Sequence, residues 1–439
     1  MNKIALISLG CAKNLVDSEV MMGHLRKSSH VFVPSPEEAD IIIINTCGFI
    51  KPAKDEAENA IQNALSVKHK NKKVRIIVTG CYVERYISVL RNNYPEVDVW
   101  LGVKDFDKIV HAVQDKPIKR SKHTFLYDHD SPRFISTSPV WAYIKISEGC
   151  SHNCSFCTIP MIKGFYRSRE TESIIQEVEI LVSKGIREIN IISQDTTFFR
   201  KDRGEKTGLI QLLQKLAYIP NLQWIRLLYC YPEEITGSLL EIMQEDKICS
   251  YLDVPFQHSH PRIIKSMNRG MDSSKSLNLL QSIRKVLPDV SIRTSLIVGY
   301  PLEGEKEFAH LLDFVRTARF DNLGVFKYWH EEGTDVFHMG DPVSDHVKNQ
   351  RQEDVMTLQM EISRKTNKKY LKKTIDVLLE KPKQGHNHVW TGRSQYQAPE
   401  VDGRIYVENV MIKNPLDKPI HKVEIRASEV YDLHGVLSS

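Results

Sequence analysis

The cysteines are the residues of this chain whose type and spacing could do chemistry. Three of the eight stand in the segment EGCSHNCSFC, at Cys150, Cys154 and Cys157, with three and then two residues between them. Thiolates are the ligands that iron-sulfur clusters prefer, and three cysteines on one loop can bind three irons of a four-iron cluster. The fourth iron stays open to a further ligand, so this spacing predicts a cluster that takes part in a reaction.

A zinc knuckle is the alternative for the same loop. Structural zinc requires four ligands, and no second cysteine pair lies nearby in the sequence, although His152 could serve as the fourth ligand. We favour the cluster because of the spacing and because of the barrel that the surrounding sequence predicts.

Cys11, Cys47 and Cys81 lie far apart in the sequence, yet each follows an apolar segment of strand type: ISLGC, INTC and VTGC. The carboxyl ends of parallel strands meet at one edge of a sheet, and ligand sites in open α/β sheets lie outside that edge. Gly10 and Gly80 would let the backbone approach a bulky cofactor. The alternative is three buried core cysteines, but their common place at strand ends predicts a second three-cysteine cluster.

Cys230 and Cys249 do not belong to a comparable set of cysteines. Cys230 stands in IRLLYCY, a strand-like segment, and Cys249 lies near a predicted helix end. Buried cysteine commonly acts as a small apolar residue, so we expect both to be structural.

The elements that must position these cysteines form an α/β pattern. Near the start, apolar segments at 3–9, 41–46, 74–79 and 97–101 predict parallel strands, and helix-forming segments include 53–68 and 105–114. From residue 141, strands and helices alternate again. Strands are predicted at 141–147, 187–193, 224–230, 251–256, 291–299 and 322–329, with helices at 171–184, 208–217, 233–246, 273–286 and 304–318. Right-handed crossovers would curl these strands into an open (βα)6 partial barrel.

The chain length of 439 residues suggests about three domains. We expect an N-terminal α/β domain at 1–116, a polar linker at 117–138, the barrel at 139–370, ending in a polar helix at 345–370, and a small antiparallel β-barrel at 371–439. No apolar run is long enough to span a membrane, and the start carries no secretory cleavage site. These features predict a cytoplasmic protein with reduced thiols.

The order of domains and several motifs resemble the radical SAM methylthiotransferase family over essentially the whole chain. The motifs are SLGCAKNLVDSE at 8–19, NTCGFI at 45–50, TGCYVERY at 79–86, YLDVPFQH at 251–258 and MNRG at 267–270. The branch that acts on small-subunit ribosomal protein twelve is similar in ISQDTT at 192–197, APEVDG at 398–403 and YDLHG at 431–435. Two positions depart from the pattern: Leu302 replaces a usual glycine, and His434 stands where that branch often has tryptophan.

The resemblance implies a transferase with two 4Fe-4S clusters and S-adenosylmethionine as cofactors. The cluster at Cys150, Cys154 and Cys157 would cleave S-adenosylmethionine, and the resulting deoxyadenosyl radical would remove hydrogen from the β-carbon of an aspartate. The cluster at Cys11, Cys47 and Cys81 would supply sulfur, and a second S-adenosylmethionine would supply the methyl group. Both clusters must then face one cavity.

Polar residues at the predicted barrel strand ends are candidates for holding S-adenosylmethionine. Each could also be a loop cap, a surface charge or a core hydrogen-bonding group. The candidates are Ser193, Gln194, Asp195, Gln257, His258, Arg269 and Arg293, with the two arginines suited to a carboxylate. A dinucleotide or P-loop fingerprint is absent, which argues against those cofactors.

Two rival functions differ in the partner. A sister enzyme would methylthiolate adenosine in tRNA with the same cofactors, and a non-catalytic protein would use its metal to bind RNA or act as a scaffold. The net charge of +5 decides neither, but residues 372–439 carry ten Lys and Arg against nine Asp and Glu. RNA binding usually needs a basic surface, so this domain favours a basic ribosomal protein. A scaffold would prefer closed metal sites. The expected partners are therefore the ribosomal protein, an electron donor and a sulfur donor; nucleic acid is not favoured, and no membrane is expected.

Overall fold

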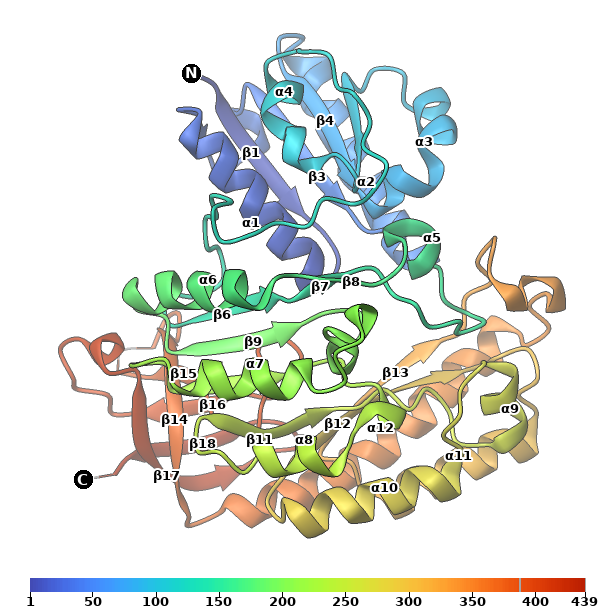
Figure 1. Ribbon diagram of the computed structural model, residues 1–439, viewed down its shortest axis with the longest axis vertical. Helices are drawn as coiled ribbons and strands as arrows, with labels where there is room; N and C mark the ends of the chain where they lie inside the picture. Colours follow the sequence, from blue (N-terminus) through green and yellow to red (C-terminus); the bar gives the residue numbers. More distant parts are fainter. Residues whose placement is uncertain (387, 439) are drawn as a thin grey trace.

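The computed structural model describes residues 1–386 and 388–438. Residues 387 and 439 belong to the predicted C-terminal domain and lie outside the described part. Three β-structures follow one another along the chain: a parallel sheet, a larger parallel sheet and a closed barrel. Figure 1 shows the first, in blue, stacked on the second, in green and yellow, with the barrel, in red, against one end of the second sheet. The boundaries at 116, 138 and 370 stay predictions.

The N-terminal sheet is parallel, as its uninterrupted apolar strands predicted. Its strand order is β2 (Val31–Phe32), β1 (Lys3–Ser8), β3 (Ile41–Thr46), β4 (Arg75–Gly80) and β5 (Val99–Gly102). The helices of this unit are α1 (Ala12–Lys27), α2 (Lys51–Lys70), α3 (Cys81–Asn93) and α4 (Ile109–Val113).

Strand β3 shows why this sheet is covered on both faces. All of its residues are buried, as expected for a strand between two helical layers. Ile41 and Ile43 pack with residues of α1 and α4, whereas Ile42 and Ile44 pack with residues of α2 and α3. The period of two along the strand thus sends alternate side chains into separate cores.

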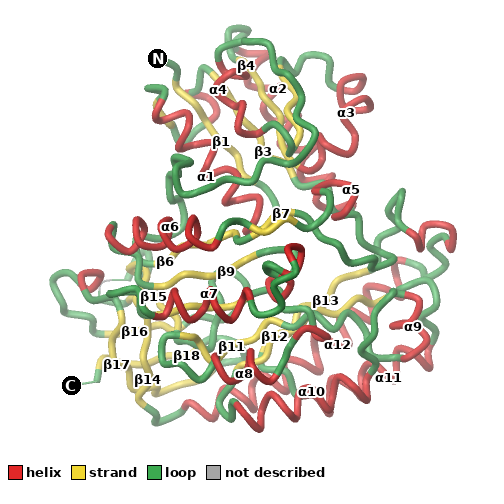
Figure 2. The backbone as a smooth tube through the Cα atoms, viewed as in Figure 1, coloured by secondary structure: helices red, strands yellow, loops and turns green. Residues whose placement is uncertain are grey.

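The second sheet is the predicted open barrel. Within the described residues it has six parallel strands in sequence order: β6 (Trp141–Lys145), β9 (Glu188–Ile192), β10 (Trp224–Leu227), β11 (Ile248–Asp253), β12 (Ser291–Val298) and β13 (Asn322–Lys327). Strands β6 and β13 are its two edges. Figure 2 shows the helices of this unit along the outside of the strands; they are α6 (Thr171–Ser183), α7 (Gly208–Ala217), α8 (Gly237–Ile242), α9 (Pro261–Ser266), α10 (Ser273–Val286), α11 (Glu305–Ala318) and α12 (Asp345–Asn367).

Two predicted elements of the barrel were too long. The strand expected at 224–230 ends at Leu227, because Tyr229 adopts a positive φ of 61° and turns the chain. The helix expected at 233–246 is reduced to α8, which starts where the Thr236 side chain accepts a hydrogen bond from the Leu239 amide. Between β6 and β9 the chain also forms a short ribbon, β7 (Ser147–Glu148) with β8 (Arg167–Ser168), and the helix α5 (Ile159–Lys163).

The C-terminal domain is a closed barrel in the order β14 (Thr374–Pro382), β15 (Trp390–Arg393), β16 (Ile405–Glu408), β18 (Leu433–Leu437) and β17 (Ile420–Ser428). The pairing between β16 and β18 is parallel, and the other pairs that close the barrel are antiparallel. Closure leaves no free strand edge. Within the described residues, none of the helices combines the length and the apolar composition that crossing a bilayer requires.

Candidate active site

The first cysteine set lies at adjacent strand ends of the N-terminal sheet. Ser8 is in register with Asn45, and Thr46 is in register with Gly80, so β1, β3 and β4 end side by side. Cys11, Cys47 and Cys81 follow these ends and line the same cavity. This register supports the prediction that the three residues lie close together. Their role as cluster ligands stays a prediction.

Gly10 makes this close approach possible. It has a φ of 90°, and a Cβ placed on it would lie 2.6 Å from the Cβ of Cys47, well inside any normal contact distance. A residue with a side chain would also be strained at this φ. Cys11 and Cys47 can therefore lie at the same edge of the sheet only because residue 10 is glycine.

The second cysteine set lies on the loop between β7 and α5. The Cys150 amide donates to the Gly164 carbonyl at 3.0 Å, which closes the loop at its base. Arg269 lies beside it, with 3.7 Å between its Nη1 and the Sγ of Cys154. A cation next to a thiolate stabilises the charged form, so Arg269 suits a loop of metal-binding thiolates.

Both cysteine sets line one cavity of about 780 Å³ between the N-terminal sheet and the carboxyl ends of the barrel strands. None of the described cysteines forms a disulfide. Within the described residues, no group of His, Cys, Asp or Glu is arranged to hold a single metal ion. A four-iron cluster does not need such a group, because each thiolate binds a different iron. Six free thiols on one cavity therefore fit two clusters.

Burial raises the pKa of several of the free thiols. Loss of solvation raises the pKa of Cys47 and of Cys150 to about 11 and that of Cys157 to about 12. Without a metal these three thiols are thus protonated at neutral pH, and binding of iron to them must release their protons.

A ring of four buried charges ties the two cysteine sets together. Lys145 contacts the carboxylates of Asp17 and Glu148, and Lys163 Nζ lies 3.1 Å from Asp17 and 3.6 Å from Glu148. Asp17 is on α1, which begins after Cys11, while Glu148 and Lys163 flank the second cysteine loop. Burial would raise the pKa of Glu148, but the two ammonium groups outweigh it and lower this pKa to about 2.

The predicted polar residues divide into two groups. Gln194, Gln257, Arg269 and Arg293 line the cavity, whereas Ser193 and Asp195 are buried behind the described lining. Ser193 bonds Ser147 at 2.8 Å, and Asp195 bonds His152, which does line the cavity, at 2.6 Å. Arg293 is already paired with Asp253 and Asp402, so its charge is less available than the sequence suggested.

His258, the further candidate, is fully buried and bonds Glu303 at 2.9 Å. Cys230 and Cys249 are buried in apolar clusters, as predicted, and are not part of the described cavity lining. Cys230 follows β10 rather than lying within it.

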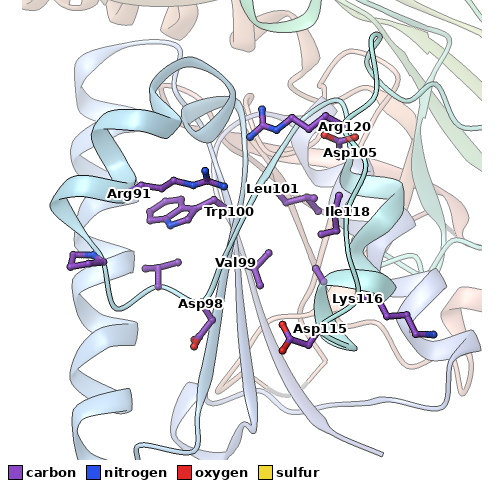
Figure 3. Close-up of a pocket in the computed structure, with 13 residues that line it drawn as sticks. Arg91, Asp98, Val99, Trp100, Leu101, Asp105, Asp115, Lys116, Ile118 and Arg120 are labelled. Atoms are coloured by element: carbon purple, nitrogen blue, oxygen red, sulfur yellow. The ribbon is translucent and has the colours of Figure 1, made fainter.

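A second cavity, of about 570 Å³, lies at the edge strand β5, where the Arg91 side chain extends toward Trp100 (Figure 3). Its lining contains none of the cysteines. The chemistry predicted from the cysteines therefore belongs to the first cavity.

Three parts of the chain match known protein families. Family models match residues 3–102 (uncharacterized protein family UPF0004), residues 144–315 (radical SAM superfamily) and residues 373–437 (TRAM domain). A ribosomal protein uS12 methylthiotransferase RimO from Aquifex aeolicus is 42% identical over 434 residues, covering 99% of this chain and 96% of the relative. The RimO of Geotalea uraniireducens is 42% identical over 440 residues, covering 99% of this chain and 98% of the relative.

The chain belongs to the RimO family. It is therefore an enzyme, a radical SAM methylthiotransferase, of a class that uses S-adenosylmethionine and a 4Fe-4S cluster. A solved structure with the same fold is the radical SAM methyltransferase TsrM of Kitasatospora setae, with a TM-score of 0.54 and 13% identity over 76% of this chain and 77% of that chain. The cobalamin-dependent enzyme OxsB has a TM-score of 0.51 and 12% identity over 82% of this chain and 56% of that chain.

Sequence patterns did not indicate several of the residues that line the cavity of this RimO-family chain. Lys13, Tyr229, Tyr231, Asp253 and Lys163 all line the cavity. The Tyr231 ring stacks on His152, with 3.7 Å between ring centres, and the Arg269 guanidinium lies 4.0 Å from its centre. Lys13 could have been noticed from its place two residues after Cys11, whereas the tyrosines carry no local signal.

The Gly10→Ala variant is expected to lose iron from the first cysteine set. The added Cβ would collide with Cys47 and displace it, so total iron should fall by about half if each set holds one four-iron cluster. Deoxyadenosine formation should persist, because the Cys150 loop is untouched. Iron analysis and product assays measure both.

Gly204→Ala is the matched control, since Gly204 has a φ of 82° but nothing within 4 Å of an added Cβ. It places a side chain at a similarly positive φ and should keep its iron. Full iron content in Gly10→Ala would contradict the placement of Cys47 beside residue 10.

Proposed function

We propose that this enzyme adds a methylthio group to the β-carbon of an aspartate in ribosomal protein uS12, with two 4Fe-4S clusters and S-adenosylmethionine. The observation that carries the proposal is that Cys11, Cys47 and Cys81 line the same cavity as Cys150, Cys154 and Cys157. A reaction that joins a radical step to a sulfur step needs both in one place. The relatives named RimO support the substrate.

Each cysteine set would hold one cluster. When bound, the clusters and S-adenosylmethionine supply the radical that removes hydrogen, the sulfur and the methyl group. The chain must hold these groups and orient the substrate carbon between them. Gln194, Gln257 and Arg269 are the predicted S-adenosylmethionine contacts that reach the cavity, and Arg269 suits a carboxylate because its guanidinium can donate two parallel hydrogen bonds.

The cavity wall is suited to radical chemistry because aromatic rings form much of it. Phe49, Phe156, Tyr328 and Trp329 line it. Apolar rings exclude water from the reacting centre and prevent side reactions there. His152 is fixed by both Asp195 and Tyr231, so this part of the wall is preorganised.

The C-terminal domain contributes directly to the cavity. Pro399, Glu400 and Val401 are among the lining residues, and the Glu400 carboxylate accepts a hydrogen bond from the Tyr143 hydroxyl at 2.9 Å. A carboxylate held at this position would attract a basic side chain next to the target residue. It would repel the phosphates of tRNA, which supports a ribosomal protein over a nucleic acid.

The proposed reaction needs two partners besides the substrate. An electron donor is required for the reductive cleavage of S-adenosylmethionine, and a sulfur donor must replace the sulfur that is used. A substrate that is a ribosomal protein also supports our expectation of a cytoplasmic location.

A competition experiment tests the proposed function. Reduced, iron-loaded enzyme is incubated with S-adenosylmethionine, purified uS12 and unmodified tRNA together, and both products are analysed by mass spectrometry. We expect methylthioaspartate in uS12 and unmodified tRNA. Methylthioadenosine in tRNA with unmodified uS12 would assign the chain to the tRNA-modifying alternative instead.

A further inference from the structure

We propose that Lys13 binds the side-chain carboxylate of the substrate aspartate and thereby selects aspartate as the residue that receives sulfur. This inference rests on the proposed function and goes further by naming the group that recognises the substrate. Lys13 is the second residue of α1, two residues after Cys11, and it lines the cavity shared by the two cysteine sets.

The surroundings of Lys13 leave its charge available. Its Nζ lies 3.4 Å from the centre of the Tyr229 ring and 3.4 Å from the Ser193 carbonyl oxygen. In residues 1–386 and 388–438, no carboxylate forms an ion pair with it, and Asp253, whose charge acts on it, is itself paired with Arg293. Lys13 therefore has no carboxylate in direct contact, and a bound carboxylate could form an ion pair with it.

The other cations of the cavity either are paired with carboxylates or lie away from the Cys11 set. Lys163 is paired with Asp17 and Glu148, and Arg293 is paired with Asp253 and Asp402. Arg269 contacts Cys154 and the Pro255 carbonyl, so it lies with the Cys150 set. Lys13 thus lies beside the Cys11 set and, in the described structure, forms no ion pair with a carboxylate.

The chemistry of the product fixes where the group that binds the carboxylate must lie. The β-carbon that receives sulfur is bonded directly to the carboxylate carbon of aspartate. Whatever group holds the carboxylate must therefore lie close to the source of sulfur, which the proposed function assigns to Cys11, Cys47 and Cys81. Lys13 meets this condition, because only one residue separates it from Cys11.

The Tyr229 ring gives Lys13 a fixed position. Tyr229 is held at a φ of 61°, and its amide donates to Asp253 at 3.1 Å. A cation placed over an aromatic face keeps its charge while losing conformational freedom. The ammonium is therefore preorganised before the substrate arrives.

The test compares two peptides that span the modified segment of uS12, one with the target aspartate and one with asparagine in its place. The iron-loaded wild-type enzyme should bind the aspartate peptide more tightly and modify it with the lower KM. In Lys13→Gln, the dissociation constant and the KM for the aspartate peptide should rise about 10–100-fold, the usual weight of a hydrogen bond to a charged group. The preference over the asparagine peptide should disappear, and Lys13→Arg should restore part of it.

Iron content and substrate-free cleavage of S-adenosylmethionine should stay at the wild-type level in Lys13→Gln, because Lys13 is not a cluster ligand in this account. Lys327→Gln is the matched control. Lys327 also lines the cavity, but on β13, with its ammonium 2.7 Å from the Asn349 side chain. This variant should keep the preference for aspartate.

Two results would overturn the inference. One is a Lys13→Gln enzyme that still prefers the aspartate peptide as strongly as wild type does. The other is loss of iron in this variant, which would show that Lys13 serves the cluster rather than the substrate. A wild-type enzyme that modifies neither peptide nor intact uS12 would instead contradict the proposed function, so the two failures are distinguishable.

Discussion

Replacement of Cys150, Cys154 and Cys157 together by alanine is expected to abolish cleavage of S-adenosylmethionine to deoxyadenosine. Each thiolate is assigned to one iron, and its removal leaves that iron without a protein ligand. We assign the electron that cleaves S-adenosylmethionine to the cluster that these three residues would hold. The rate of deoxyadenosine formation under reducing conditions should fall at least about 1,000-fold, equivalent to roughly 4 kcal/mol of barrier. Chromatography of the quenched reaction measures it.

Cys230→Ala provides the control for this prediction. Cys230 is fully buried in the apolar core of the barrel, so its replacement costs packing but removes no ligand. This variant should keep its full iron content and its deoxyadenosine formation. Deoxyadenosine from the triple variant, or loss of about four irons from Cys230→Ala, would contradict the assignment of the ligands.

Replacement of Cys11, Cys47 and Cys81 together should separate the two halves of the reaction. The Cys150 loop lies on another domain and keeps its own ligands, so this variant should still form deoxyadenosine. It should form no methylthio product, because the proposed source of sulfur is gone. Iron should fall from about eight to about four per chain. Iron analysis, deoxyadenosine assay and mass spectrometry of uS12 measure the three quantities.

Suppose that this triple variant keeps four irons but forms neither deoxyadenosine nor the methylthio product. That result would show that the first cluster is needed for the radical step itself. Full iron content would show that these cysteines are core residues after all. Cys249→Ala is the control for the stability that is lost when a buried thiol is removed. Cys249 is buried in the cluster of apolar residues around β11.

The sequence predicted the cysteine sets because their signal is local. The spacing of Cys150, Cys154 and Cys157 is visible in ten residues, and Cys11, Cys47 and Cys81 each follow a strand that its apolar residues reveal. Parallel strands then place all three at one edge, which the register of β1, β3 and β4 bears out. The order of the three β-structures was predicted for the same reason.

The polar residues of the site were harder to predict because their neighbours are distant in the sequence. Arg293 is paired with Asp402, which lies 109 positions later in the chain. Asp17 meets Lys145 and Lys163 only when α1 packs against the barrel. Such pairing decides which charges remain available to ligands, and no local pattern records it.

Backbone conformation was a second source of error. The strand at 224–230 was predicted from apolar residues, yet the turn at Tyr229 ends it early and directs the Tyr229 ring toward Lys13. A positive φ at a tyrosine has no compositional signature. The residues that hold Lys13 were therefore found only in the structure.

The most direct test of the account is mass spectrometry of uS12 and of tRNA from cells with and without the gene for this chain. We expect uS12 to carry a methylthio group on one aspartate when the gene is present and to lack it when the gene is deleted, while tRNA is unchanged. A deletion strain with fully modified uS12, or one in which only tRNA loses methylthioadenosine, would contradict it.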